Sequence, residues 1–311
     1  MTSVARAVPA GGQPPAGTRP APGRSIRDRN RVVGLLAVLP AFLVVVGFMA
    51  FPVLFALYIS FTRTNGLTYR WVGLSNYVAL LRDPIVHEVF LNNVTFLVSV
   101  PLVIFVALVV SVLLFDRVRG WRAFRVIFFL PNVLSVAVIG IMFRNAFGYY
   151  GAVNQALGLL GVEPVQFFTD GRLAIAVIVL ALVWSGFGYQ SLLLLAGLTS
   201  IDPAVFEAAA LDGAGWWKRL WFITLPNVRR VLGFVFIINV LYTFSSLFGF
   251  VFVMTAGGPG FETTTIDYLV YLKAFSSTNL GAGAALAVLL FLFIGVLTLI
   301  QNRVFRLQEE D

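Results

Sequence analysis

Residues 90–115 read FLNNVTFLVSVPLVIFVALVVSVLLF, a stretch without a single Asp, Glu, Lys or Arg. A helix rises about 1.5 Å per residue, and the hydrocarbon layer of a membrane is about 30 Å thick, so about 20 apolar residues are enough for one crossing. The stretch is longer than that. It therefore predicts a membrane-spanning helix.

Five further apolar segments meet the same length criterion. Two of them contain prolines, Pro40 and Pro52 in the first and Pro131 in the third. Membrane helices tolerate proline because neighbouring helices and local adjustments satisfy the freed carbonyl groups. We therefore expect an all-α membrane protein with six transmembrane helices, at about 34–61, 90–115, 123–147, 173–199, 231–255 and 280–302.

The composition excludes several other classes of protein. Hydrophobic residues make up 59% of the chain and charged residues only 12%, against about 25% charged in a typical soluble domain. The chain has no cysteine and one histidine, His87, so we expect no disulfide framework, no metal site and no haem. Lipid is the solvent that suits such a chain.

The distribution of Lys and Arg predicts the orientation. Sixteen of the 22 basic residues fall on one side, in the N-terminal tail, the 116–122 turn and its flank, the 200–230 loop and the C-terminal tail, and six fall on the other. Cytoplasmic loops carry the excess of basic residues, so we expect both termini in the cytoplasm. This asymmetry also explains the net charge of +8 without nucleic acid as a partner.

The N-terminal residues differ from the rest of the chain. They are rich in Pro, Gly and Ala without apolar periodicity, so we expect 1–30 to be a disordered basic cytoplasmic tail and 31–311 to be the transmembrane domain. The first apolar segment has no small-residue cleavage site, which favours a retained helix over a signal peptide.

The loop between the fourth and fifth segments predicts two short helices joined by a corner. Asp202 suits an N-cap with Pro203 at the first helical position, and good helix formers fill 203–211. Gly213 interrupts this run, and a second, aromatic-rich helix is expected around 215–222 before Pro226. An amphipathic loop that lies on the membrane surface would explain the same pattern.

At this loop the chain resembles the permeases of ABC importers. Their "EAA" loop is matched, including its nine-residue gap, by Glu207, Ala208, Ala209, Asp212, Gly213, Ala214, Ile223, Leu225 and Pro226. The resemblance implies the type I ABC importer permease fold. It also implies that residues 200–228 are a coupling loop that docks on a cytoplasmic ATPase, where Glu207 pairs with a basic residue.

The likeness continues through most of the chain after residue 30. Phe129-Leu-Pro131 with Ser135, Gly151-Ala-Val-Asn154, Trp184 with Gly188, and Thr255-Ala-Gly-Gly-Pro259 are similar to the carbohydrate-uptake branch and its maltose-type first subunit. Two positions depart from the family pattern. Arg230 stands where a proline is common, and the Phe248-Gly249 region replaces an acidic residue in the fifth segment.

Polar residues inside the apolar segments predict a substrate pathway. Asn239, Thr243 and Ser246 share one face of the fifth helix. Gly186, Tyr189 and Gln190 cluster on the fourth helix, and Ser135 lies in the third. The resemblance places substrate contacts on the fourth and fifth helices, and such a lining suits a neutral polyol. Contacts between helices are the alternative role, since Ser, Thr and Asn often join membrane helices.

Sequence motifs for ATP hydrolysis are absent. The chain has no Gly-x-x-x-x-Gly-Lys-Ser/Thr phosphate cradle and no nucleophile–base–acid arrangement, so it is expected not to be an enzyme or to bind a cofactor. The resemblance implies that partner subunits bind ATP and Mg²⁺. The implied partners are an ABC ATPase dimer, a second related permease, an extracytoplasmic sugar-binding protein, the sugar and the lipid of the bacterial cytoplasmic membrane.

Three alternatives remain for the function. The first is a permease of the same class for another solute such as glycerol phosphate, although a phosphate ester calls for Lys or Arg in the pathway. The second is a secondary transporter or channel that works without ATP, although no intramembrane chain of Asp, Glu or His is visible. The third is a membrane scaffold, which leaves the match from Glu207 to Pro226 unexplained.

Overall fold

The structure is a computed structural model that describes residues 24–307, and side chains for residues 33, 34 and 36–304. The chain divides between Leu54 and Phe55 into two units, and each is described by itself. The predicted tail falls largely on residues 1–23, which lie outside the described residues. Helix α1 begins at Arg24, within the segment predicted as tail.

The first unit is helical throughout its described part. It holds α1 (Arg24–Val45), the π-helical turn η1 (Val46–Ala50) and the start of α2 (Phe51–Ser60). The Phe51 N–H donates to the Val46 carbonyl, five residues back, just before Pro52. A π-turn of this kind is one of the local adjustments that accommodate proline in a membrane helix. Residues Leu36–Ser60 are apolar enough and long enough to cross a membrane, as the sequence predicts.

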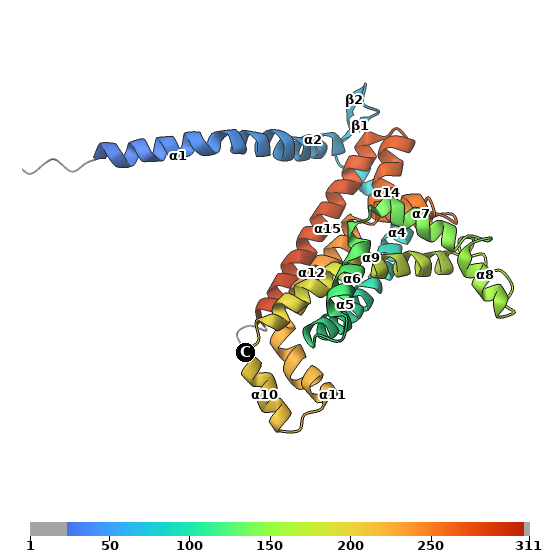
Figure 1. Cartoon of the computed structure of the whole chain (residues 1–311). Coiled ribbons are helices and arrows are strands. Elements are labelled where there is room, and N and C mark those ends of the chain that lie inside the picture. The colour runs from blue at the N-terminus through green and yellow to red at the C-terminus, as the bar shows by residue number, and fades with distance from the viewer. Residues whose placement is uncertain (1–23, 308–311) are drawn as a thin grey trace, which may run out of the picture. The chain divides into compact units, whose positions relative to one another are not determined.

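The second unit, residues 55–311, contains the remaining elements (Figure 1). They are β1 (Thr62–Thr64), β2 (Tyr69–Trp71), α3 (Ser75–Arg82), α4 (Pro84–Phe96), α5 (Ser99–Phe115), α6 (Trp121–Val133), α7 (Val136–Ala146), α8 (Ala152–Leu159), α9 (Gly171–Thr199), α10 (Pro203–Leu211), α11 (Trp216–Arg219), η2 (Leu220–Thr224), α12 (Leu225–Ser245), α13 (Phe248–Met254), α14 (Ile266–Tyr271), η3 (Leu272–Ser276) and α15 (Leu280–Leu307).

In the described part of the chain, five helices are long and apolar enough to cross a membrane. Helices α6 and α7 meet at an angle of 97°, and together they are long and apolar enough for a sixth crossing if the two form one bent span. The expectation of one continuous helix over 123–147 was therefore wrong. Pro131 cannot donate within the helix, and the Ser135 hydroxyl accepts from the Val138 N–H to start a new helix, α7.

Two other predicted spans have different ends. The span predicted at 90–115 begins earlier, at Pro84, where the Asp83 side chain caps α4, and its helix is interrupted between α4 and α5. The span predicted at 231–255 was shifted, since a continuous helical run covers Trp216–Ser245. This run ends where Ser246 leaves the helical conformation at φ −143°, and the short helix α13 follows.

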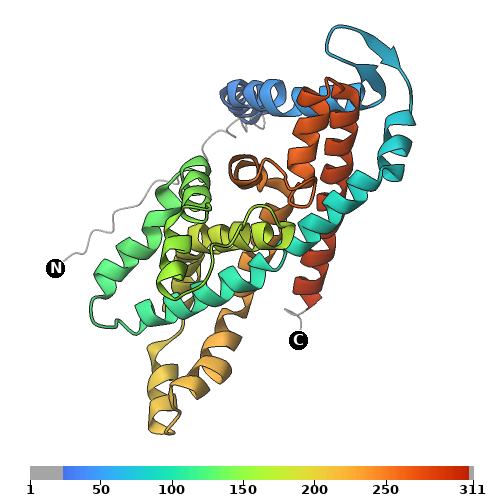
Figure 2. The same cartoon turned by 90° about the vertical axis from the view of Figure 1, so that its right-hand side faces the viewer.

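Within the second unit, β1–β2 and α10–α11 lie at opposite ends (Figures 1 and 2). The two strands are antiparallel, with Thr62 opposite Trp71 and Thr64 opposite Tyr69. The hairpin and α3 therefore form one end of the bundle, and the two short helices form the other.

Polar side chains join the helices near the hairpin end. Lys273 donates to Asp83 at 2.8 Å. Burial opposes the charge on Asp83, but the hydrogen bonds from Lys273 and from the Ile85 N–H, with the charge of Lys273, keep its pKa below the usual value of 3.8. Asn93 is fully buried, donates to the Thr243 carbonyl and accepts from the Ile266 N–H, both at 2.8 Å.

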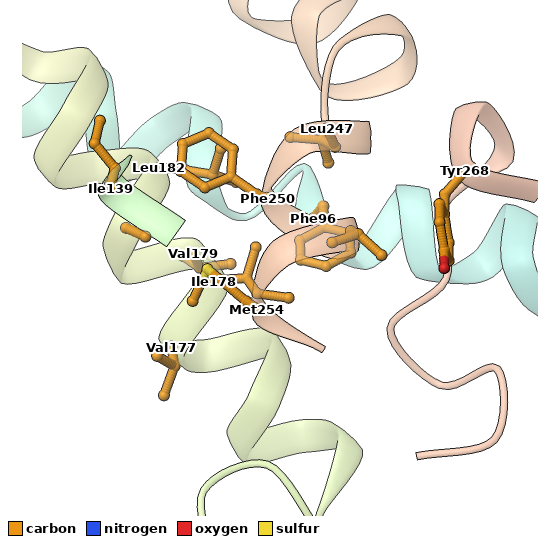
Figure 3. Packing of buried hydrophobic residues seen from close by; sticks show 12 residues of the cluster. Phe96, Ile139, Val177, Ile178, Val179, Leu182, Leu247, Phe250, Met254 and Tyr268 are labelled. Carbon is orange, nitrogen blue, oxygen red and sulfur yellow. The ribbon is translucent and has the colours of Figure 1, made fainter. Parts of the chain in front are cut away.

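The largest hydrophobic cluster lies where α9 meets α7 and α13 (Figure 3). Ile178 and Leu182 of α9 pack with Ile139 of α7 and with Phe250 and Met254 of α13. Three of these residues, Ile139, Leu182 and Phe250, also line the cavity described below. The cluster therefore fixes one wall of that cavity.

Candidate functional site

A cavity of about 370 Å³ lies between α5, α6, α7, α9, α12 and α13. Its lining mixes hydroxyl, amide and aromatic groups with apolar side chains, and none of the lining residues in the described part of the chain is charged. The lining consists of Ser99, Val103, Pro131, Asn132, Leu134, Val136, Ile139, Leu182, Ser185, Gly186, Tyr189, Gln190, Ile238, Asn239, Tyr242, Thr243 and Phe250.

The cavity brings together five of the seven residues that the sequence predicts for a substrate pathway. Gly186, Tyr189 and Gln190 come from α9, and Asn239 and Thr243 come from α12. Their spacings along the chain put each group on one face of its helix. The two helices pack against each other, so the two faces meet.

The other two predicted residues do not line this cavity. Ser246 follows the last residue of α12 and is exposed, because the helix ends before the face from Asn239 through Thr243 can continue to it. Ser135 is also exposed, and its hydroxyl is the N-cap of α7. Their positions therefore reflect helix ends that the sequence pattern did not reveal.

Four polar lining residues were missed by the sequence reasoning. Tyr242 is three residues after Asn239, so helical spacing gave a signal for it, and Ser185 directly precedes Gly186. Asn132 and Ser99 carried no such signal. Asn132 faces the cavity next to the bend after α6, and Ser99 lies at the start of α5, where a predicted continuous helix is interrupted.

Gln190 is the lining residue with an unmet hydrogen-bonding capacity. Its side chain is only 7% exposed, and its Oε1 atom has no hydrogen-bond partner among the described residues. In contrast, Asn239 donates to the Val235 carbonyl at 2.7 Å and Thr243 donates to the Asn239 carbonyl at 2.9 Å. Leaving a buried acceptor unpaired costs about 1–3 kcal/mol, so a hydroxyl that donates to Gln190 would be favoured.

Two neighbouring glycines of α9 have different reasons to be glycine. A Cβ atom on Gly188 would lie 2.0 Å from the Phe128 carbonyl oxygen of α6, which is far inside contact distance. A Cβ atom on Gly186 would meet Val103 at 3.6 Å, an ordinary contact. Gly188 is therefore required for the close crossing of α6 and α9, whereas Gly186 leaves space in the cavity lining.

The second notable feature is the elbow, a name we give to residues 203–222 at the end of the bundle opposite the hairpin (Figures 1 and 2). The predicted start and end of its first helix are confirmed. Asp202 accepts from the Ala204 N–H at 2.9 Å, and α10 covers Pro203–Leu211. The second helix begins at Trp216, and it continues through η2 into α12 instead of ending before Pro226.

The corner of the elbow is a Schellman motif built on Gly213. The Ala214 N–H donates to the Ala209 carbonyl at 2.9 Å, and the Gly213 N–H donates to the Ala210 carbonyl at 3.1 Å. Gly213 has φ +70°, which a β-carbon disfavours. The space around a Cβ there is open, with no atom within 4 Å, so the backbone conformation alone selects glycine within this chain.

This geometry predicts the effect of substitutions at Gly213. We expect Gly213→Val to lower transport strongly, because the left-handed conformation costs a β-branched residue more than about 1–2 kcal/mol. Gly213→Asn should retain most of the transport, since Asn tolerates this conformation. Initial rates of solute uptake, normalised to the amount of protein in the membrane, measure the difference. Equal loss in both variants would show that side-chain volume, not φ, decides.

The residues that match the EAA pattern lie on α10, at the corner that follows it, and at the base of the elbow, where η2 leads into α12. Glu207 and Ala208 are exposed on α10, and the Glu207 carboxylate makes no hydrogen bond or ion pair with the rest of the described chain. At the base, Ile223 and Leu225 are half-buried. Asp212, Gly213 and Pro226 are exposed, Ala214 is half-buried and Ala209 is buried.

The elbow also exposes large apolar side chains. Leu211 is 89% exposed and Phe222 is 79% exposed, and Trp217 is exposed as well. Exposed apolar groups that gather in one place mark a surface for another protein or for a membrane.

Comparison with known proteins agrees with this architecture. The family described as "binding-protein-dependent transport system inner membrane component" matches residues 72–307. The lactose transport system permease protein LacF of Rhizobium radiobacter is 32% identical over 284 residues, covering 89% of this chain and 95% of LacF. The sn-glycerol-3-phosphate transport system permease protein UgpA of Agrobacterium fabrum is 34% identical over 292 residues, covering 90% and 97%.

A solved structure has the same fold. It is a chain from the bacterial alginate ABC transporter in complex with an alginate pentasaccharide-bound periplasmic protein, with a TM-score of 0.78 and 22% sequence identity. The match covers 91% of this chain and 97% of that chain.

Proposed function

This chain belongs to the family of binding-protein-dependent transport system inner membrane components, and we propose from this premise that it is one permease subunit of an ATP-driven sugar importer. The multi-pass membrane architecture and the lactose relative support the proposal. Its place would be the bacterial cytoplasmic membrane. There the chain would cross the membrane six times if α6 and α7 form one span. The excess of basic residues supports a cytoplasmic location for both termini.

The observation that carries the proposal is the uncharged polar lining of the cavity. Tyr189 and Tyr242 present rings to it, and Gln190 presents an acceptor that lacks a donor. Sugars offer hydroxyl donors for such an acceptor and apolar C–H faces for aromatic rings. A neutral saccharide is therefore the solute that this lining suits best.

Glycerol phosphate is the second candidate, since a glycerol-3-phosphate permease is 34% identical to this chain. A phosphate ester carries negative charge, and its binding sites usually present Arg or Lys. The lining residues include neither in the described part of the chain. The chemistry of the cavity therefore favours the neutral sugar over the phosphate ester.

Transport requires partners in this proposal. ATP and Mg²⁺ would be bound by a separate ABC ATPase dimer, on which the elbow docks with Glu207 paired to a basic residue. A second, related permease would complete the pathway. An external sugar-binding protein would deliver the substrate, and the similar alginate transporter forms a complex with such a periplasmic protein.

The proposed mechanism is alternating access. Closure of the ATPases would move the elbow, and with it α9 and α12, which are continuous in the chain with its two helices. Both helices line the cavity, so their movement would open it to one side of the membrane and close it to the other. ATP drives the cycle because it binds the two states with different affinity.

The test uses the complete complex reconstituted in liposomes. Gln190→Leu removes the unpaired acceptor, and we expect sugar uptake at saturating sugar-loaded binding protein to fall about tenfold, the effect of losing one good hydrogen bond. Gln155→Leu is the matched control and should transport normally, because Gln155 is exposed on α8 and does not line the cavity.

Three outcomes would contradict the proposal in different ways. Unchanged uptake by the Gln190 variant would remove this cavity from the pathway. Stimulation of ATP hydrolysis by glycerol phosphate and by no sugar would favour the second candidate. Uptake in liposomes that lack the ATPase would make the chain a secondary transporter.

A further inference from the structure

The end of α5 contacts both arms of the elbow through two adjacent residues. The Trp216 Nε1–H of α11 donates to the Asp116 Oδ2 at 3.3 Å. The rings of Phe115 and of Phe206, on α10, lie with their centroids 5.3 Å apart. The end of α5 therefore contacts α10, the first arm of the elbow, through aromatic rings and α11, the second arm, through a hydrogen bond.

The surroundings of these two contacts are tightly packed. Val112 of α5 and Leu198 of α9 are buried together with Leu220 and Val228 at the base of the elbow, and Phe115 and Trp216 pack against this cluster. The space left between Asp116, Phe206, Trp216 and Arg219 is about 20 Å³, enough for about one water molecule. The elbow and α5 thus meet at a packed interface, and the hydrogen bond of Asp116 lies at its exposed edge.

The connectivity of the chain gives this interface its significance. α9 leads into α10, and α11 leads through η2 into α12, so these two cavity walls are covalently joined to the elbow. α5 leads instead into α6 and has no such connection. Yet Ser99 and Val103, near the other end of α5, line the same cavity. From Ser99 to Phe115 the helix is about 24 Å long, at 1.5 Å per residue.

We propose that Asp116 and Phe115 form a latch with Trp216 and Phe206 that makes α5 follow the elbow. α5 already packs along α9 and α12, where Ala107, Leu194 and Val235 are buried together. The latch adds a connection at the elbow itself, and without it the end of α5 would lag behind the elbow and the cavity wall would shear. Asp116 and Trp216 are positioning residues in this account, since they act through α5 and touch no substrate. The inference rests on the proposed function, because it requires that a partner ATPase moves the elbow.

The first test measures coupling in the reconstituted complex as sugar transported per ATP hydrolysed. Trp216→Phe keeps the ring and removes the N–H donor, and Asp116→Leu removes the acceptor. Both should lower the ratio about threefold to tenfold, the effect of losing one ordinary hydrogen bond. Asp116→Asn keeps an acceptor oxygen and should restore the ratio.

Trp71→Phe is the matched control, because Trp71 is 63% exposed and lies on β2, at the end of the bundle opposite the elbow. The ATPase should co-purify with every variant, and ATP hydrolysis should continue. An unchanged ratio in both Trp216→Phe and Asp116→Leu would overturn the latch. If the wild-type complex itself showed no ATP-driven uptake, the proposed function would fail instead, so the two failures are distinguishable.

The second test uses the absence of cysteine from the chain, which gives a clean background for cross-linking. A Phe115→Cys, Phe206→Cys double variant lacks the ring contact and should transport less sugar per ATP. Bridging the two thiols with a short bifunctional reagent should bring the ratio back toward the wild-type value. A further fall on bridging would show that the elbow must slide over α5 during transport, and it would overturn the proposal.

Discussion

Glu207→Arg is expected to reduce ATP-driven sugar uptake to background while the chain still inserts in the membrane. Glu207 is exposed on the elbow and has no partner in the described chain, so its replacement removes no contact of the fold. In the proposed complex its carboxylate would pair with a basic residue of the ATPase, and arginine would place two positive charges together. Loss of one partner of a buried charge pair costs about 2–5 kcal/mol, or about 30-fold or more in binding.

The measurement is uptake of labelled sugar together with co-purification of the ATPase. Glu163→Arg is the matched control, since Glu163 is also exposed but lies in the loop between α8 and α9, outside the elbow. This control should keep the ATPase bound and transport sugar. A Glu207→Arg complex that transports at the wild-type rate would argue strongly against docking through this carboxylate.

Gly188→Ala is expected to destabilise the helix bundle more than Gly140→Ala, Gly186→Ala or Gly249→Ala would. The new Cβ atom would lie 2.0 Å from the Phe128 carbonyl oxygen, and this obstacle is backbone that cannot rotate away. Helices α6 and α9 would have to separate. Overpacking of this kind usually costs about 1–3 kcal/mol, and a backbone obstacle puts the cost at or above the upper end.

Thermal unfolding of the purified protein in detergent, with its yield from the membrane, measures this effect. Gly186→Ala provides the control two residues away, because its Cβ atom would lie at an ordinary 3.6 Å from Val103. We expect the control to unfold at the wild-type temperature. If the two alanine variants unfolded at the same temperature, the close crossing of α6 and α9 would not be a source of stability.

Hydropathy was sufficient to find the membrane helices, but it did not locate their breaks. Lipid imposes a minimum apolar length, and each of the six predicted segments overlaps helical structure of that character. The bend after α6 depends on a proline followed by a serine that caps a new helix, which a window of mean hydropathy averages away. The same averaging joined α13 to the fifth span across the break at Ser246.

The candidate site was predictable where it depends on helical spacing within one unbroken helix. Tyr189 and Gln190 on α9, and Asn239 and Thr243 on α12, are examples. Residues next to breaks were either wrongly included, as Ser246 was, or missed, as Asn132 was. The contact between Asp116 and Trp216 joins positions 100 residues apart, and no local pattern in the sequence indicates it.

The way α5 meets the elbow also defines what a transferable module would be. Residues 200–228 read as a self-contained cassette, yet one side of their fitting surface belongs to Phe115 and Asp116. A chimaera that receives residues 200–228 from a related transporter would dock on a new ATPase but keep its original Phe115 and Asp116. Pairing the permease with a different ATPase would therefore require transfer of both the elbow segment and the end of α5, although they are far apart in the gene.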